Sequence, residues 1–347
     1  MRFQNKIIEW YQINKRTLPW RSTTNAYVIW LSEIILQQTR VAQGLPYFNK
    51  FLENFPTVRD FAEASEDQVL KLWQGLGYYS RGRNMLFTAQ QVMTEHNGIF
   101  PNTYDQLIKL KGIGEYTAAA ISSFSTNENK AVLDGNVFRL LSRYFGINEP
   151  INSTIGKKMF TKFAQDLVKG ETASVYNQAI MEFGALQCTP KSPKCELCPL
   201  AMDCFALQHQ QINNLPVKLK KGKIRERWFH YFVATQENSI LMKQRMQGDI
   251  WQKLYDFPLI ETENPIAYTH PDFIKQVKKS FGNEVIIRSI SQKKHLLTHQ
   301  IIYVHFFVLE NYMINFSLHT EIKLALLADF KSLPHPKVIG DFIEMYL

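Results

Sequence analysis

All four cysteines of this chain lie in one short segment, residues 188–204. The cysteines are Cys188, Cys195, Cys198 and Cys204, spaced C-x6-C-x2-C-x5-C. Cysteines of a hydrophobic core are scattered along a chain, so this grouping indicates the ligands of one metal centre. Zinc sites usually contain two C-x2-C pairs about a dozen or more residues apart, whereas a single pair with wider arms can surround a cubane. We therefore predict a structural [4Fe–4S] cluster, with a zinc site and unligated thiols as the alternatives.

The composition indicates a protein that binds a polyanion inside the cell. A length of 347 residues is sufficient for two or three domains, and a net charge of +9 favours a nucleic-acid partner. Thiols kept as metal ligands need a reducing compartment, so we expect a cytoplasmic location. The N-terminal segment contains no apolar signal region, and no apolar run is long enough to span a bilayer. We therefore expect no contact with membranes.

The chain divides into a helical part, residues 1–208, a basic linker, residues 209–227, and a β-rich part, residues 228–347. One stripe of apolar residues at helical spacing comprises Tyr27, Trp30, Leu31, Ile34 and Ile35. The linker loses its apolar pattern and gains lysine and arginine, so it either touches phosphates or is a solvated tether. Short runs rich in Val, Ile, Tyr and Phe, such as IIYVHFFVLE, predict strands in the β-rich part. We expect this part to be a separate α/β domain.

Two glycines flank an isoleucine at residues 110–114, between an apolar helix that we expect to end at Leu110 and a small-residue helix. Glycine allows the backbone to approach a neighbour closely, and the N–H groups at a helix start point outward. Gly112 and Gly114 can therefore hold a DNA phosphate without sequence preference. An ordinary corner between two helices has the same pattern.

Two carboxylates are candidates for acid–base chemistry. Asp134 precedes Gly135 and Asn136 at the start of a helix, where its simplest role is that of an N-cap. Glu33 lies off the apolar stripe, near Trp30. A carboxylate among Trp, Leu and Ile side chains would have the raised pKa that a general acid requires. An exposed, solvated glutamate is the alternative for Glu33.

The glycine hairpin, the aspartate after it and the four cysteines beyond, in this order, resemble the helix–hairpin–helix DNA glycosylases with an iron–sulfur cluster. Within that superfamily the resemblance is closest to the MutY adenine DNA glycosylase family, and it extends over essentially the whole chain. Its blocks are LPWR at 18–21, WLSEIILQQTRV at 30–41, LWQGLGYYSRGRN at 72–84, LDGNVFRLLSR at 133–143 and YNQAIMEFGALQC at 176–188. The resemblance implies a mainly α, two-lobed helix–hairpin–helix fold with a [4Fe–4S] cluster loop, followed by a C-terminal α/β Nudix-like domain.

The resemblance also implies a DNA N-glycosylase of base excision repair that removes adenine mispaired with 8-oxoguanine, or with guanine, from double-stranded DNA. The adenine would be flipped out of the stack, protonated at N7 by Glu33 and released from a sugar stabilised by Asp134. We expect a monomer, and the sequence identifies no repair or clamp partner. The other implied positions are Tyr116 and Asn136 beside the reaction centre, Trp20, Arg21 and Glu182 around adenine, and Gln38 and Tyr78 beside the oxidised guanine.

Tyr116 distinguishes this interpretation from an endonuclease III-like glycosylase/lyase, which has a lysine at this position of the hairpin. That lysine forms a Schiff base with the sugar and then cleaves the strand. Tyrosine has no amine, and Lys111 lies on the other side of the hairpin. We therefore expect a monofunctional glycosylase. A further alternative is an iron–sulfur DNA-binding protein without catalysis, which would need neither Glu33 nor Asp134.

The segments GDIWQKLYDFPLIE at 248–261 and HLLTHQIIYVHFF at 295–307 resemble the Nudix-like domain of the MutY family. The glutamate-rich magnesium-binding helix of Nudix hydrolases has no counterpart here, so we expect binding without hydrolysis. The resemblance implies recognition of 8-oxoguanine by a Phe-Ser-His loop, which in this chain is Leu297-Thr298-His299. Thr298 and His299 keep the polar contacts, while leucine replaces the aromatic ring. A structural histidine of the sheet is the alternative for His299.

Overall fold

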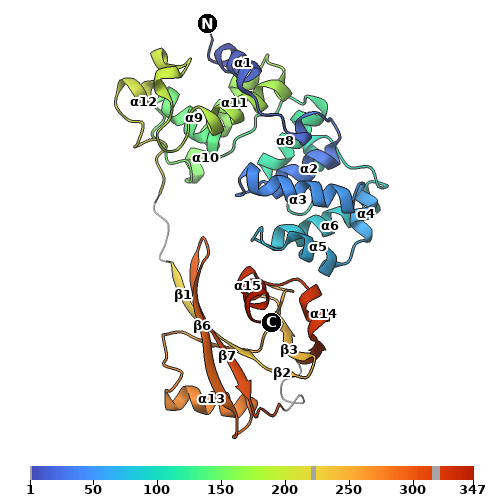
Figure 1. Cartoon of the computed structure of the whole chain (residues 1–347). Coiled ribbons are helices and arrows are strands. Elements are labelled where there is room, and N and C mark those ends of the chain that lie inside the picture. Colours follow the sequence, from blue (N-terminus) through green and yellow to red (C-terminus); the bar gives the residue numbers. More distant parts are fainter. Residues whose placement is uncertain (1, 220–223, 315–320) are drawn as a thin grey trace. The chain divides into compact units, whose positions relative to one another are not determined.

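The computed structural model describes residues 2–219, 224–314 and 321–347. The chain forms two compact units (Figure 1). The first contains the chain up to Ala64 and the stretch from Asn84 to the linker, and the second contains Ser65–Arg83 and the chain after the linker. Within the second unit, the Tyr79 hydroxyl donates to the His335 carbonyl oxygen at 3.1 Å. Segments far apart in the sequence therefore belong to one body.

The first unit is helical, and polar caps define where its main helices begin. Asn25 and Asp134 accept backbone N–H bonds at the starts of the helices that carry the two candidate carboxylates. The helices are α1 (Phe3–Asn14), α2 (Ala26–Ile35), α3 (Val41–Asn54), α4 (Val58–Glu63), α7 (Tyr104–Leu107), α8 (Glu115–Thr126), α9 (Gly135–Phe145), α10 (Thr154–Val168), α11 (Ala173–Leu186) and α12 (Phe205–Gln208), with most of α6 (Ser80–Glu95) and short 3-10 turns at Pro19–Arg21, Cys195–Leu197 and Ala201–Asp203.

One core of the first unit lies between α1, α9, α10 and α11. Three residues of α1 at a spacing of four, Phe3, Ile7 and Tyr11, face this core, as the helical period requires. The helix α2 differs from the one-sided stripe predicted for it, because nearly all of its residues are buried. Glu33, which lies off the predicted stripe, is therefore also inside the unit.

Among the described residues, the second unit contains two four-stranded sheets. The first has the order β5-β1-β7-β6, with β1 and β7 parallel and the other pairs antiparallel, and the second has the order β2-β3-β4 with β8 beside β3. The strands are β1 (Arg225–Val233), β2 (Thr235–Gln236), β3 (Ser239–Gln244), β4 (Tyr255–Asp256), β5 (Leu259–Thr262), β6 (Ile286–Leu296), β7 (Gln300–Glu310) and β8 (Ile322–Leu326). The helices are α5 (Glu66–Trp73), α13 (Pro271–Phe281), α14 (Leu327–Ser332), α15 (Lys337–Tyr346) and the start of α6.

Successive side chains of β1 and β7 point to opposite faces of the first sheet. Both of these sets are apolar, so both faces of the sheet are apolar. Tyr231 and Phe306 pack with α14 and α15, whereas Phe232 and Phe307 pack with α13 (Figure 1). This arrangement of helices on both faces of a sheet is the α/β architecture predicted from the sequence. Neither here nor elsewhere in the described chain is any helix long and apolar enough to cross a membrane.

The linker predicted at residues 209–227 is not a free tether along its whole length. The Ile151 backbone N–H donates to the Val217 carbonyl at 3.1 Å, and Asn152 exchanges two hydrogen bonds with the backbone of Leu219. The strand β1 already begins at Arg225. Residues 220–223 of this linker lie outside the described residues. The domain boundaries at residues 208 and 228 stay predictions.

Candidate active site

Glu33 is buried on α2, with only 7% of its surface exposed. The hydroxyl of Tyr116, in the first turn of α8, donates to Glu33 Oε2 at 2.7 Å. Within the described residues no lysine or arginine forms an ion pair with Glu33, and the nearby Arg21 is paired with Glu182. The exposed glutamate considered from the sequence is therefore the wrong interpretation of Glu33.

The environment of Glu33 favours its protonated form. Burial, the largest cause, raises the pKa of Glu33 to about 7; the hydrogen bond from Tyr116 opposes this rise, the charge of Asp134 adds to it and the charge of Arg21 opposes it. The raised pKa predicted from the sequence is thus confirmed. Near neutral pH, a carboxyl group with this pKa can both hold and release a proton, as general acid catalysis requires.

Asp134 is the N-cap of α9 and uses both of its carboxylate oxygens. Oδ1 accepts from the backbone N–H groups of Asn136 at 2.8 Å and Val137 at 2.7 Å, and Oδ2 accepts from Asn136 Nδ2 at 2.7 Å. Burial raises the pKa of Asp134, and these three hydrogen bonds and the charge of Arg139 oppose the rise. The N-cap predicted from the sequence is confirmed, and the cap also fixes the orientation of the carboxylate.

Arg139 connects Asn136 to the start of the cysteine segment. Its Nη2 donates to Asn136 Oδ1 at 3.0 Å and to the Gly184 carbonyl at 2.6 Å, and its Nε donates to the Cys188 carbonyl at 2.7 Å. Arg139 was not among the residues predicted from the sequence. Its signal is the spacing of three residues from Asn136, which places both side chains on one face of α9.

The helix α11 approaches this cap closely at a glycine. A Cβ atom at Gly184 would lie 2.8 Å from Asn136 Cβ and 2.9 Å from the Asn136 carbonyl oxygen. Two of the three nearest atoms belong to the Asn136 backbone, which cannot rotate away as a flexible side chain can. Only glycine at position 184 therefore permits this distance between α11 and the start of α9.

Glu182 on α11 is held by two arginines. Arg21 donates to both of its carboxylate oxygens, at 2.9 and 2.7 Å, and Arg16 donates through Nε at 2.8 Å and Nη2 at 2.5 Å. Burial alone would raise the pKa of Glu182, but hydrogen bonds from Arg16 and Arg21 and the Arg21 charge lower it to about 2. Trp20, beside Arg21, is buried in edge contact with Phe48. The structure thus brings Arg21 and Glu182 together as a fixed ion pair, and adds Arg16, which was not predicted from the sequence.

The glycine hairpin joins α7 to α8. The helix α7 ends at Leu107 rather than at the predicted Leu110, because residues 108–110 continue as tight turns. Gly112 has φ +75°, and a Cβ there would lie 2.9 Å from Asn84 Cβ, so the turn needs glycine. Gly114 is the N-cap residue of α8 and has no other atom near its missing Cβ. The start of α8 is therefore open to an approaching anion.

The four cysteines line one cavity together with Arg143, Leu140 and Phe183. None of the four cysteines forms a disulfide. Arg143 Nη1 donates to Cys188 Sγ at 3.5 Å, and backbone N–H groups of Leu200 and Leu207 donate to the sulfurs of Cys198 and Cys204. Four thiols, N–H donors to sulfur and an apolar lining are the surroundings that an iron–sulfur cluster needs. These residues therefore fit the predicted [4Fe–4S] cluster.

Two residues predicted to lie beside the oxidised guanine have a left-handed backbone. Gln38, in the first unit, has φ 55°, and Tyr78, in the second, has φ 50° and is 40% exposed. This conformation is strained for a bulky side chain such as tyrosine and is often kept at a functional position. The Tyr78 hydroxyl makes a short hydrogen bond with Thr298 Oγ1. His299 is exposed in the turn between β6 and β7, rather than within a strand.

Three segments of the chain match models of known protein families. Residues 31–166 match the HhH-GPD superfamily of base excision DNA repair proteins, residues 188–204 match the iron–sulfur binding domain of endonuclease III, and residues 230–345 match the NUDIX domain. These matches confirm the predicted fold class and favour the iron–sulfur cluster over zinc.

Several curated proteins named adenine DNA glycosylase are similar to this chain. The protein of Buchnera aphidicola subsp. Baizongia pistaciae is 36% identical over 87% of this chain and 84% of its own length. The Mus musculus protein is 31% identical over 86% of this chain and 68% of its own length. The Homo sapiens protein is 40% identical over 61% of this chain and 41% of its own length.

Solved structures show the same helical architecture. A thermostable thymine-DNA glycosylase has a TM-score of 0.56 and 27% identity, covering 60% of this chain and 95% of its own. Endonuclease III in a non-covalent DNA complex has a TM-score of 0.52 and 19% identity, covering 61% of this chain and 99% of its own. At this identity the second comparison indicates the fold alone.

Proposed function

Because the chain belongs to the adenine DNA glycosylase family of base excision repair, we propose that it excises adenine opposite 8-oxoguanine, and opposite guanine, from double-stranded DNA. The reaction is hydrolysis of the N-glycosidic bond after the adenine nucleotide has been flipped out of the duplex. The observation that supports this proposal most directly is the pair formed by Glu33, with a pKa of about 7, and the oriented carboxylate of Asp134.

Glu33 is the proposed proton donor to adenine N7. Protonation turns adenine into a better leaving group, so the bond to the sugar breaks more easily. Its burial keeps a proton available near pH 7, and the absence of a basic ion-pair partner among the described residues leaves that proton free to move. Tyr116 holds the carboxyl group in one orientation through its hydrogen bond to Oε2.

Asp134 is the proposed stabiliser of the oxocarbenium-like sugar that forms as adenine leaves. Its charge is held in place by the N-terminus of α9 and by Asn136, so no reorganisation is needed when positive charge develops. Arg139 supports Asn136 from the opposite side. Water then adds to the sugar in place of adenine and gives up one proton, which restores the protonated form of Glu33 and completes the hydrolysis.

The adenine pocket is proposed to contain Trp20, Arg21 and Glu182. Glu182 with its two arginines remains a fixed anion, so it can accept a hydrogen bond but cannot compete with Glu33 as an acid. Because of this difference in pKa, Glu33 rather than Glu182 carries the proton near neutral pH.

The oxidised guanine is proposed to contact Gln38 and Tyr78, whose strained backbones support a functional role, and Thr298 and His299 in the turn of the second unit. Gly112 and Gly114 are proposed to bind a phosphate at the open start of α8. Phosphate contacts of this kind release counterions, so the affinity for duplex DNA should fall steeply with salt.

The segment 188–204 is proposed to hold its [4Fe–4S] cluster through Cys188, Cys195, Cys198 and Cys204. When bound, the cluster supplies a rigid cross-link of this segment. Arg139 and Arg143 bond to the first residues of the segment, and Arg139 continues to Asn136. An ordered cysteine segment therefore helps to hold Arg139 and Asn136 in place, and Asn136 in turn bonds to Asp134.

A single-turnover assay on a labelled duplex with one adenine opposite 8-oxoguanine tests the proposal. Because Tyr116 has no amine, we expect breaks at the adenine only after hot alkali. Breaks without alkali would indicate an endonuclease III-like lyase. Tight binding with no breaks under either condition would indicate a DNA-binding protein without catalysis. The same assay with guanine opposite adenine measures the preference for the oxidised base.

A further inference from the structure

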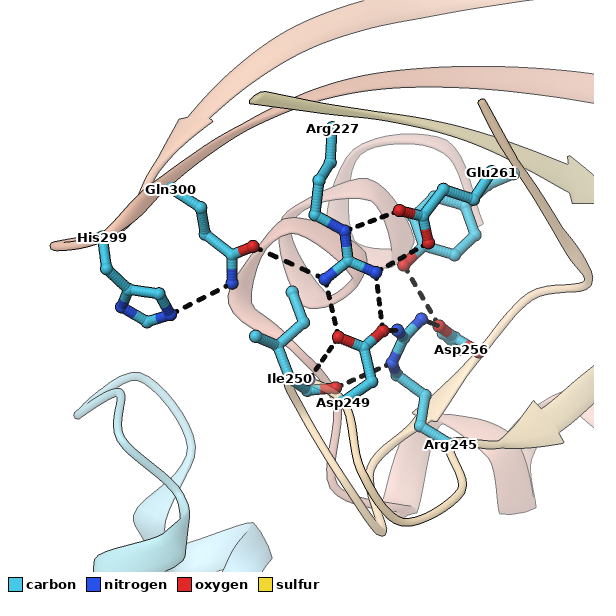
Figure 2. A network of polar contacts seen from close by, with 9 residues as sticks. Arg227, Arg245, Asp249, Ile250, Asp256, Glu261, His299 and Gln300 are labelled. Carbon is cyan, nitrogen blue, oxygen red and sulfur yellow. Dashed lines mark hydrogen bonds and ion pairs between the residues drawn. The ribbon is translucent and has the colours of Figure 1, made fainter. Parts of the chain in front are cut away.

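A hydrogen-bonded network in the second unit ends at His299 (Figure 2). At its centre, Arg227 on β1 is almost fully buried. It donates to both oxygens of Glu261, at 2.7 and 2.6 Å, and to both oxygens of Asp249, at 2.6 and 2.7 Å. Four charge-assisted bonds to two carboxylates hold the guanidinium group in one orientation.

The network is braced on its far side by a second arginine. Arg245 donates to Asp249 at 2.6 Å and to the fully buried Asp256 at 3.0 Å, and the Tyr231 hydroxyl donates to Asp256 at 3.1 Å (Figure 2). Asp249 therefore bonds to two arginines at once. The buried Arg245 fixes the position of Asp249, and Asp249 in turn fixes the direction of the Arg227 N–H groups.

Gln300 joins this interior to the exposed turn. It is the first residue of β7 and is 3% exposed. Its Oε1 lies 3.5 Å from Arg227 Nη1, and its Nε2 lies 3.2 Å from His299 Nε2. Arginine can only donate hydrogen bonds, so the amide oxygen must face Arg227 and the amide N–H₂ must face His299. The contact with Arg227 thus fixes which end of the Gln300 amide faces His299.

We propose that Gln300 is a positioning residue that selects the Nδ1–H tautomer of His299. Because the Gln300 amide donates, His299 Nε2 must accept and the ring proton must be on Nδ1. His299 then presents a hydrogen-bond donor to the solvent side, next to Thr298. This inference deepens the proposed function, since it rests on residues 298–299 contacting the strand with the oxidised guanine.

The partner of this donor is an acceptor oxygen of DNA. Two sources have that chemistry, a carbonyl oxygen of the oxidised guanine and a phosphate oxygen of the same strand. A carbonyl at position 8 distinguishes 8-oxoguanine from guanine, whereas a phosphate is present beside both. The two sources therefore differ in what the loss of the donor would do to discrimination.

The tautomer is measured by long-range ¹H–¹⁵N correlation on the full-length, cluster-loaded protein labelled in histidine. The His299 signal is assigned by its loss in His299→Gln. We expect a protonated Nδ1 and an unprotonated Nε2 in the wild-type protein. Gln300→Glu should reverse the pattern, because a carboxylate accepts from Nε2–H. An averaged signal in the wild-type protein, or a protonated Nε2, would overturn the inference.

The contact with DNA is measured separately, by single-turnover excision at increasing enzyme concentration. Gln300→Met keeps the volume and removes both bonds. It should raise the half-saturating concentration about threefold to tenfold, the effect of one hydrogen bond, while the rate at saturation stays unchanged. A change with 8-oxoguanine alone identifies the carbonyl, and an equal change with guanine identifies the phosphate.

The matched control is Gln292→Met, because Gln292 on β6 also contacts a histidine, His305, away from the turn. It should change neither the His299 signal nor the half-saturating concentration. An equal effect of both variants would reduce Gln300 to a structural role and contradict the inference. A reversed tautomer in Gln300→Glu with unchanged DNA affinity would instead contradict the proposed contact of His299 with DNA.

Discussion

Glu33 on α2 and Glu182 on α11 are both buried glutamates of the first unit, yet their pKa values are shifted in opposite directions from that of an ordinary glutamate. Glu33 has one hydroxyl partner and a pKa of about 7, whereas Glu182 has two arginines and a pKa of about 2. Burial acts on both in the same direction, so the difference comes from the cations. The same helical unit thus contains a protonatable glutamate and a fixed anion, because arginines pair with Glu182 and not with Glu33 among the described residues.

Glu33→Gln should reduce excision more than either Asp134→Asn or Tyr116→Phe. The amide keeps the size of the side chain but cannot donate the proton, so we expect the single-turnover rate to fall about a thousandfold. Binding of the mispaired duplex should change little, which gel shift or fluorescence anisotropy would measure. A rate near that of the wild-type protein would show that Glu33 is not the acid, and that its raised pKa has no part in the reaction.

Glu182→Gln should mainly lower stability. The substitution leaves Arg16 and Arg21 without their anion inside the unit, at a cost of about 3 kcal/mol in the free energy of unfolding. Urea unfolding followed by the helical circular dichroism signal measures this. Glu33→Gln is the matched control, because it strands no cation and should not lower stability at pH 8. Equal losses for the two variants would show that the arginines do not distinguish the two sites.

Asp134→Asn should slow excision about a hundredfold without unfolding α9. Asparagine is as good an N-cap as aspartate, so the helix start is retained while the negative charge is lost. The single-turnover rate and the unfolding midpoint, measured on the same preparation, separate the two roles. An unchanged rate would leave Asp134 as a cap only.

The smallest expected effect is a shift in the pH profile of excision. The wild-type rate should fall as the pH rises through about 7, because Glu33 then loses the proton that it must donate. The Tyr116 hydroxyl stabilises the ionised form, so Tyr116→Phe should raise the pKa of Glu33 and move the alkaline limb to higher pH. At pH 8 the protonated fraction would then increase a few-fold. A shift to lower pH would contradict the effect assigned to Tyr116.

Several of the features that the sequence pattern predicted correctly are local ones. The cysteine spacing, the N-cap at Asp134 and the turn at Gly112 each depend on residues a few positions apart. The partners of Glu33 and Glu182 lie 83 and 161 or more positions away, and helical spacing alone placed Glu33 off the buried stripe. Period and spacing describe one face of one helix, whereas α2 is surrounded on all sides. The resemblance of whole blocks, rather than local physics, favoured the catalytic role of Glu33 over an exposed glutamate and identified Glu182.

Gly184 has a consequence for how this protein can vary. The residue has no polar side chain and touches no substrate in the proposed reaction, yet even alanine there would press on the Asn136 backbone. That pressure would move the start of α9 and therefore Asp134. In a saturation mutagenesis experiment scored for repair, position 184 should tolerate as little as Asp134 itself. Mutational intolerance at this position would report geometry at the active site, transmitted through one missing methyl group.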